Sequence, residues 1–211
     1  RSLVNDALIT KLIEGETELD QVLQYSLGID AHESAEYLIS ARSGKRIRPI
    51  LCMFVCELMG GNIKDILHIS VAIELIHQFS LIHDDIIDGD KERRHRPSAW
   101  TAFTVEDALI AGYALHTLAF QVLLEEDSPE RVQAARRLVD ATTTMISGQA
   151  SDMTFDDLPT VSFEECLKME AAKTGALLGY ASSVGAVLSG ANEDTCNSLE
   201  VFGYELGLAY Q

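Results

Sequence analysis

Apolar residues recur every three or four positions along most of the chain, and strand-like alternation of apolar and polar residues is rare. Prolines are scarce, with four in 211 residues. This periodicity is typical of amphipathic and buried helices, so we expect an all-α protein. The predicted helices span residues 2–25, 34–41, 46–59, 65–88, 98–124, 129–152, 162–188 and 193 to the end.

Glycine and proline mark the expected breaks between these helices. A Gly-Gly pair lies at 60–61, an Arg-Pro pair at 96–97, and Pro129 follows an Asp-Ser pair that is typical of a helix start. Two further breaks are expected in DDLPTVS around Pro159 and in SGANED after Gly190.

Several predicted helices exceed twenty residues and are apolar around most of their circumference, for example ALLGYASSVGAVLSG. Such helices are usually buried in the middle of a bundle. The chain is 47% hydrophobic, which at this length is enough for a sizeable core. We therefore expect a single all-helical domain over residues 1–211, a bundle with long central helices.

The charge balance limits the partners. Lys and Arg number 16 against 33 Asp and Glu, and the formal net charge is -17. Nucleic acids and anionic membranes would be repelled, so an anionic small-molecule substrate needs local positive charge or bound cations. No uninterrupted apolar run approaches the roughly 18 residues of a membrane span, and the first residues lack the apolar core of a signal peptide. We expect a cytoplasmic protein without stable membrane insertion.

Three aspartates end the long apolar helix predicted over residues 65–88. Asp84 and Asp88 are one turn apart on the same face, with Asp85 about 100° around the helix. Carboxylates clustered at a helix C-terminus repel each other and the helix dipole, and a cation would relieve that repulsion. Oxygen ligands suit Mg²⁺, which binds through one or two carboxylates together with substrate phosphate oxygens. The alternative is a solvated charged loop, because short acidic patterns are common.

Two basic clusters accompany the aspartates. The stretch KERRHR supplies Arg93 and Arg94, whose planar guanidinium groups can bind phosphate oxygens bidentately. Upstream, SGKRIRPIL places Lys45, Arg46 and Arg48 at a predicted helix N-terminus, which favours anion binding. Ordinary surface charge is the alternative for each cluster alone. Carboxylates and arginines together favour a metal-bridged diphosphate.

Four motifs occur in the order and rough spacing of the trans-type isoprenyl diphosphate synthases, or polyprenyl synthetases: GKRIRP, HQFSLIHDDIIDGDKERRHRPS, SGQASDM and KTGALL. From about residue 40 onward the chain resembles this family, and most of all a short-chain member of the geranylgeranyl or farnesyl diphosphate synthase kind. The resemblance implies an isoprenoid synthase-type helical bundle that forms a homodimer. It also implies a magnesium-assisted, head-to-tail condensation of isopentenyl diphosphate with an allylic prenyl diphosphate.

The same resemblance implies roles for individual residues. The residues implied to coordinate magnesium on the allylic diphosphate are Asp84, Asp85 and Asp88. Those implied to assist at the allylic diphosphate are Arg93, Lys173, Thr174 and Gln211, of which Arg93 and Lys173 join the aspartates as expected catalytic residues. Those implied to hold isopentenyl diphosphate are Lys45, Arg48, His77 and Arg94. Gln149 and Asp152 of GQASD are implied to have a supporting role.

Two residues on the aspartate-bearing helix are expected to set product length. Phe79 and Ser80 lie five and four residues before Asp84, which places them roughly 6 to 7.5 Å down the helix from the metal site. Side chains there would form the floor of the product cavity. A single aromatic residue at this position resembles the family's twenty-carbon pattern, so we expect geranylgeranyl diphosphate as the product.

The sequence departs from the family at two places. His95 stands where the family usually has glycine after the arginine pair, and the chain stops at Gln211, before the family's second aspartate-rich motif. Without that motif one magnesium loses most of its protein ligands. We therefore expect a chain truncated at its C-terminus, which is inactive or nearly so as given.

Two other functions stay open. A non-catalytic regulatory subunit is suggested by Cys52 and Cys56 in CMFVC, which resembles a CxxxC pattern of such subunits, although two small core residues explain the pattern as well. A class I terpene cyclase also uses an aspartate-rich helix and magnesium. It needs no second cationic pocket, so the upstream basic cluster favours condensation.

Overall fold

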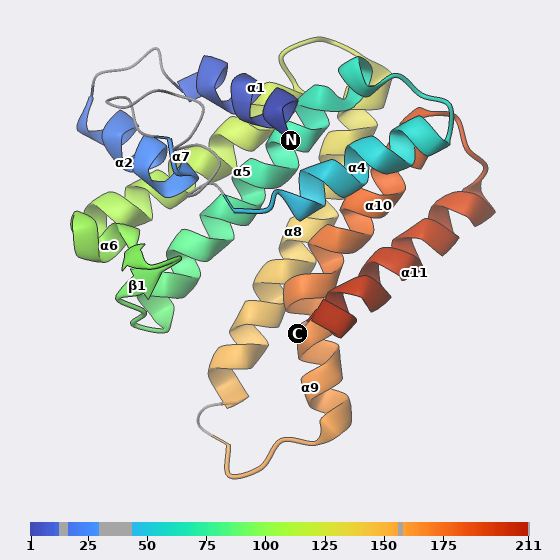
Figure 1. The fold of residues 1–211 in the computed structure, drawn as a ribbon. Coiled ribbons are helices and arrows are strands. Elements are labelled where there is room, and N and C mark those ends of the chain that lie inside the picture. The colour runs from blue at the N-terminus through green and yellow to red at the C-terminus, as the bar shows by residue number, and fades with distance from the viewer. Residues whose placement is uncertain (13–16, 30–43, 156–157, 211) are drawn as a thin grey trace. The chain divides into compact units, whose positions relative to one another are not determined.

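The computed structural model describes residues 1–12, 17–29, 44–155 and 158–210, and most of these are helical (Figure 1). The helices are α1 (Ser2–Leu12), α2 (Glu18–Leu27), α4 (Ile47–Leu58), α5 (Ile63–Ile87), α6 (Ala99–Ala102), α7 (Val105–Leu123), α8 (Pro129–Phe155), α9 (Phe163–Glu170), α10 (Ala176–Leu188) and α11 (Glu193–Tyr210). A π-helical turn, η1 (Ala171–Gly175), joins α9 to α10, and β1 (Glu92–Arg93) pairs antiparallel with β2 (Arg96–Pro97). The expected all-α class is confirmed.

Some predicted helix bounds are wrong. The helix expected over 98–124 is divided into α6 and α7 because Phe103 leaves the helical conformation, with φ −120° and ψ −132°. Thr104 then begins α7, where its hydroxyl accepts a hydrogen bond from the backbone N–H of Asp107 at 3.1 Å. The helix expected over 162–188 contains the π-helical turn η1.

The N-terminal helix expected over 2–25 also corresponds to separate elements, α1 and α2. Thr17 begins α2 with a capping box, in which its hydroxyl accepts from the Asp20 backbone N–H and the Asp20 carboxylate accepts from that of Thr17. The helix predicted at 34–41 lies outside the described residues. The breaks expected at 60–61 and before Pro129 are confirmed.

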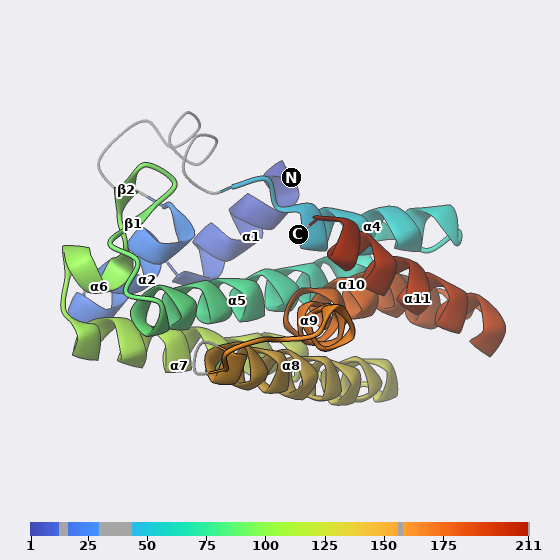
Figure 2. The same cartoon turned by 90° about the horizontal axis from the view of Figure 1, so that it is seen from below.

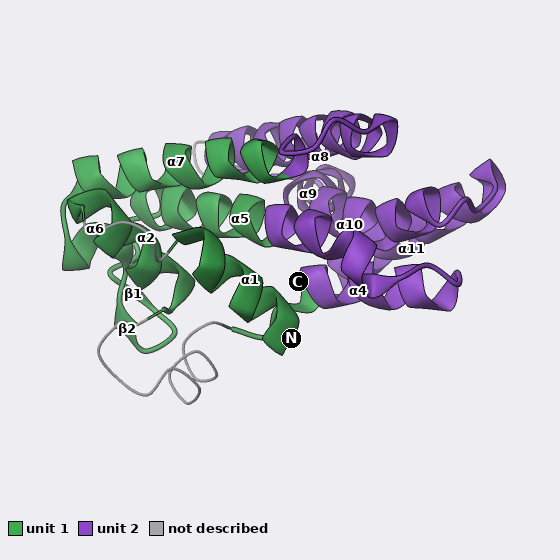
Figure 3. Ribbon diagram, turned by 90° about the horizontal axis from the view of Figure 1, so that it is seen from above, with its two compact units in different colours: residues 1–47, 74–122 green, residues 48–73, 123–211 purple. Residues whose placement is uncertain are grey.

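The chain is divided into two compact units (Figure 3). Unit 1 comprises Arg1–Ile47 and Glu74–Val122, and unit 2 comprises Arg48–Ile73 and Leu123–Gln211. The expected single domain stays a prediction.

In unit 1, Tyr25 of α2 contacts the loop that follows α5 through its ring and its hydroxyl group. The Arg96 guanidinium carbon lies 3.9 Å from the centre of the Tyr25 ring, and the Tyr25 hydroxyl donates to the Pro97 carbonyl at 2.7 Å. The indole N–H of Trp100 in α6 donates to the carbonyls of Asp85 and Asp90, both at 2.9 Å. The end of the aspartate-bearing helix is therefore held in place by aromatic side chains.

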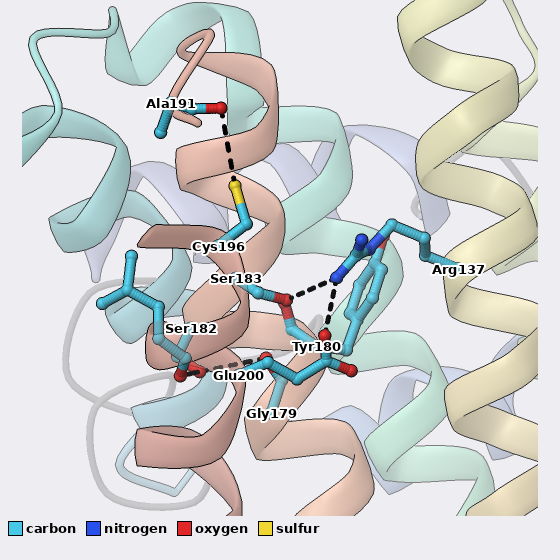
Figure 4. Close-up of polar contacts among 9 residues, drawn as sticks. Arg137, Gly179, Tyr180, Ser182, Ser183, Ala191, Cys196 and Glu200 are labelled. Atoms are coloured by element: carbon cyan, nitrogen blue, oxygen red, sulfur yellow. Dashed lines mark hydrogen bonds and ion pairs between the residues drawn. The ribbon is translucent and has the colours of Figure 1, made fainter. Parts of the chain in front are cut away.

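In unit 2, α10 is the central helix. Its residues from Ala176 to Ala186 are all buried, and it lies beside both α8 and α11 (Figures 1 and 2). Arg137 of α8 donates to the Ser183 hydroxyl of α10 at 3.1 Å and to the Glu200 carboxylate of α11 at 2.9 Å (Figure 4). The expectation that this apolar stretch lies in the middle of a bundle is confirmed.

One helix of the described part of the chain, α5, is long and apolar enough to cross a membrane by length and composition. However, 67% of its most apolar window is buried inside the protein. It also carries Glu74, Asp84 and Asp85. These are features of a core helix.

Candidate functional site

The aspartates at the end of α5 have different environments. Asp85 is 3% exposed, and its Oδ1 accepts from Arg93 Nε at 2.6 Å and lies 2.5 Å from Arg93 Nη2. Burial raises the pKa of Asp85 above its usual range, and the ion pair with Arg93 opposes that rise. Asp84 is half-buried and Asp88 is exposed. Asp85 is therefore engaged by a protein cation.

This arrangement fits a shared metal ion better than a closed protein cage. Among the described residues, no group of three His, Cys, Asp or Glu side chains could hold a metal ion. Asp84 and Asp88 are one helical turn apart, and their backbones are joined by the Asp88 N–H to Asp84 carbonyl hydrogen bond of 2.8 Å. Mg²⁺ commonly takes one or two carboxylates and completes its shell with water and phosphate oxygens. The carboxylates of Asp84 and Asp88 fit a Mg²⁺ ion that is shared with a substrate phosphate.

The two basic clusters meet in unit 1 at Gly44. A Cβ atom at this position would lie 2.6 Å from Cζ and Nη2 of Arg94, so the Arg94 guanidinium packs directly on the Gly44 backbone. Gly44 also has φ +73°, a conformation that favours glycine. Lys45, which follows it, is exposed. The sequence predicted each cluster but not their contact.

Arg94 reaches this position because a tight hairpin turns the chain. Arg94 and His95 have φ +54° and +62°, and they join β1 to β2. Such turns usually carry Asn and Gly, whereas this one carries two bulky residues. The family glycine that His95 replaces would fit this left-handed position with less strain.

A small cavity of about 30 Å³ lies beside these arginines in unit 1, and its lining includes Gln78, Asp85, Arg93, Arg94 and Arg96. The three arginines therefore share one cavity with the Asp85 carboxylate.

The remaining predicted site residues of unit 1, His77, Phe79 and Ser80, lie on α5. His77 and Ser80 are half-buried, and the Ser80 hydroxyl donates to the His77 carbonyl at 2.9 Å. Phe79 is 8% exposed and packs edge-on against the imidazoles of His83 and His116, with ring centres 4.8 and 5.1 Å apart. Burial lowers the pKa of both histidines. Sequence reasoning did not predict that His116 of α7 contacts Phe79.

In unit 2, Lys173 lies on the π-helical turn η1. Its Nζ donates to Asp152 Oδ2 of α8 at 2.5 Å. A Cβ atom at Gly148 would lie 2.3 Å from the Lys173 backbone nitrogen, so α8 passes very close to this turn. Single-turn π-bulges are frequent at functional sites.

The other predicted residues of unit 2 are Thr174, Gln149, Arg48 and Gln211. Thr174 is 6% exposed, and both polar atoms of the Gln149 amide are buried without a hydrogen-bond partner. Burial and Asp152 raise the pKa of Glu170, which Lys173 opposes. Arg48 is half-buried in the first turn of α4, and Gln211 lies outside the described residues.

A mostly helical fold, a carboxylate pair at the end of a long helix and two basic loops that meet at Gly44 are features expected of an isoprenoid synthase. The family model described as Polyprenyl synthetase matches residues 30–211. The chain belongs to this family.

Relatives agree with this assignment. A (2E,6E)-farnesyl diphosphate synthase of Mycobacterium tuberculosis (strain H37Rv) is 40% identical over 190 residues, which cover 90% of this chain and 52% of the relative. A geranylgeranyl diphosphate synthase of the same organism is 39% identical over 170 residues, 80% of this chain and 49% of the relative. The chain thus spans about half the length of these curated relatives.

The fold comparison gives the same result. The crystal structure of a polyprenyl synthetase from Streptomyces coelicolor A3(2) has a TM-score of 0.90 and 43% sequence identity to this chain. The match covers 100% of this chain and 62% of that one. The expected isoprenoid synthase fold is therefore confirmed.

Proposed function

We propose that the protein is a trans-prenyltransferase that condenses isopentenyl diphosphate, head to tail, with an allylic prenyl diphosphate. The observation that carries this proposal is the meeting of two basic loops at Gly44, in the unit that holds the aspartates. Condensation needs a cationic site for each of two diphosphates: Arg94 on Gly44 beside Lys45 suits one of them, and Arg93 beside the aspartates suits the other. Family membership and the relatives' names support the same reaction.

Asp84 and Asp88 would bind Mg²⁺ together with the allylic diphosphate, with Asp85 as the third aspartate of the motif. When bound, the metal offsets negative charge on the diphosphate. Asp85 is paired with Arg93, so its first effect is to orient that guanidinium. Arg93 would then donate to the diphosphate oxygens as negative charge builds on them.

The reaction starts when the allylic carbon–oxygen bond breaks and its electron pair leaves with the diphosphate. Lys173 and Arg93 would stabilise the departing group as cations, and Thr174 and Gln211 as hydrogen-bond donors. The double bond of isopentenyl diphosphate attacks the resulting cation and forms the new carbon–carbon bond. The proton lost from the intermediate passes to the released diphosphate.

The second substrate would be held by the other basic residues. Lys45 and Arg94 suit this role because the contact of Arg94 with Gly44 brings it next to the Lys45 backbone. Arg48 and His77 would complete the isopentenyl diphosphate site. Arginine can bind phosphate oxygens bidentately, whereas lysine acts as a point charge.

The hydrocarbon part of the site must stay apolar, because water or a nearby cation would quench or repel an allylic cation. Phe79 and Ser80 would form the floor of this region. Burial lowers the pKa of His83 and His116, which favours the neutral form of the two imidazoles beside Phe79. With one aromatic residue at the floor, we propose geranylgeranyl diphosphate as the product, formed in the cytoplasm by a homodimer.

The two alternatives are weaker. Cys52 and Cys56 are 0% and 3% exposed, and burial raises the pKa of the Cys52 thiol to about 12. Thiols packed inside unit 2 are ordinary core residues, not a surface for binding another subunit. A terpene cyclase would have no use for the second basic loop at Lys45.

Substitution of the aspartates tests the proposal. In the full-length protein supplied with Mg²⁺, isopentenyl diphosphate and an allylic primer, Asp84→Asn and Asp88→Asn should each lower the elongation rate about a hundredfold or more. The matched control is Asp140→Asn, an exposed aspartate on α8. Elongation that is equally fast in all three variants would contradict the proposed roles.

A further inference from the structure

Unit 1 contains a buried carboxylate, Glu74, that interacts with the arginines of both basic loops. Glu74 of α5 is 1% exposed, and its Oε1 accepts from Arg46 and, at 2.6 Å, from Gln78 Nε2. Its Oε2 is buried without a hydrogen-bond partner. A buried carboxylate is costly unless a nearby cation compensates it, and Arg46 supplies that cation here.

Arg46 connects this carboxylate to the loop that carries Lys45. The Arg46 guanidinium is held on three sides: Nε donates to Asn5 Oδ1 at 3.2 Å, Nη2 donates to the Leu27 carbonyl at 2.9 Å, and Nη1 pairs with Glu74. The Arg46 backbone has φ +55°, a strained conformation for a residue with a side chain. Such strain persists only where the surroundings enforce it. The ion pair with Glu74 supplies part of that constraint, immediately after Lys45.

Glu74 also acts on Arg94. The Arg94 guanidinium is repelled by three other arginines, at positions 46, 93 and 96, and attracted by Glu74. Burial is the main cause that lowers the pKa of Arg94, and Glu74 is the largest influence that opposes it. The guanidinium packs on the backbone of Gly44, two residues before Arg46. One buried carboxylate is thus common to both basic loops.

We propose that Glu74 is a positioning residue for the second diphosphate. It fixes the Gly44–Arg46 backbone through Arg46 and attracts the Arg94 guanidinium onto Gly44, so that Lys45 and Arg94 are set for the same diphosphate. This inference rests on the proposed function and assigns a role to a residue that itself touches no substrate. Glu74 acts only through the cations that it orients.

The test is the kinetics of Glu74→Gln in the full-length protein, below the unfolding temperature of the variant. Glutamine keeps the shape and one acceptor oxygen but removes the charge. We expect KM for isopentenyl diphosphate to rise about tenfold or more, the usual effect of losing a supporting partner. KM for the allylic primer should stay within about twofold, because the aspartate end of α5 keeps its contacts with Arg93 and Trp100.

Glu200→Gln is the matched control, because it removes a carboxylate paired with an arginine, Arg137, in unit 2. It should lower the unfolding temperature and leave both KM values unchanged. Glu74→Asp keeps the charge and should restore part of the affinity for isopentenyl diphosphate. If Glu74→Gln does not fold, Glu74→Asp serves as the test, with a smaller selective rise in the same KM expected.

Two results would overturn the inference: unchanged KM values in the Glu74 variants, or equal rises for both substrates, which a general loss of structure would cause. A normal enzyme whose Glu74 variants behave in this way contradicts the inference alone. An unmodified protein that neither binds isopentenyl diphosphate nor elongates a primer contradicts the proposed function, and the inference with it.

Discussion

The pairing of Arg46 with Glu74 illustrates how burial decides the energetic weight of an ion pair. Their side chains are 1% and 2% exposed, whereas those of Arg137 and Glu200 are 29% and 37% exposed. Removal of one partner leaves a buried charge uncompensated in the first case and a hydrated charge in the second. The two pairs should therefore respond very differently to substitution.

We predict that Arg46→Met lowers the free energy of unfolding by about 3–5 kcal/mol, because Glu74 keeps its desolvation cost and loses its main partner. Arg137→Met should cost about 1 kcal/mol or less. Urea denaturation of the two variants and the unmodified protein measures both values. Equal losses would show that burial of the first pair carries no special weight.

Phe79 gives a second prediction at the residue scale. Its ring is packed against His83 and His116, so replacement by alanine opens space next to α7. Phe79→Ala should therefore lengthen the product, which chromatography of the dephosphorylated alcohols measures. Phe120→Ala is a useful comparison, because Phe120 contacts His116 and not Phe79 among the ring pairs of the described residues. An unchanged product length in Phe79→Ala would remove Phe79 as the floor.

At the scale of elements, the close packing of α8 against η1 determines the position of the Lys173 backbone. The distance of 2.3 Å from a Cβ at Gly148 to the Lys173 backbone nitrogen leaves no room for a side chain, and the obstructing atoms are backbone. A methyl group there must push the π-helical turn away from α8. The Lys173–Asp152 ion pair joins the same two elements.

Gly148→Ala should consequently lower stability by about 1–3 kcal/mol, the usual cost of overpacking. It should also lower the elongation rate, because Lys173 moves with the turn. Ser147→Ala is the control, since Ser147 is an exposed neighbour on α8. Thermal unfolding and steady-state rates give the two readouts. A Gly148→Ala variant as stable and active as the control would contradict this account of the packing.

The sequence predicted helices well where periodicity alone determines them, as in α5, α8 and α11. It failed where local contacts override periodicity. The break at Phe103 depends on a Thr104 cap inside an otherwise continuous apolar pattern, and η1 depends on close packing against Gly148. The β1–β2 hairpin was missed because its turn residues, Arg94 and His95, are not the ones that such turns prefer.

The candidate site was also predictable only in part, because some of its features depend on contacts that form when the chain folds. Residue type and spacing indicated the aspartates, arginines and lysines, since these side chains carry the chemistry themselves. The separate environment of Asp85 and the contact of Arg94 with Gly44 depend on how the chain folds back on itself. Glu74 gave no signal because a single acidic residue in an apolar helix has no spacing pattern.

At the scale of the whole molecule, the protein is strongly acidic, but several of its arginines are concentrated in one region of unit 1. The formal net charge is -17, yet in unit 1 Arg93, Arg94 and Arg96 line one cavity with Asp85, and Arg94 packs on Gly44, next to Lys45. Such a cluster of cationic side chains in an acidic protein favours the binding of small anionic substrates. This distribution agrees with the proposed use of diphosphate substrates.

The most direct test of the central claim is an elongation assay. The full-length protein is incubated with Mg²⁺, labelled isopentenyl diphosphate and each allylic primer, and the dephosphorylated products are separated by chain length. We predict a labelled twenty-carbon alcohol from the full-length protein. Absence of any elongated product from a folded full-length protein would contradict the prenyltransferase assignment.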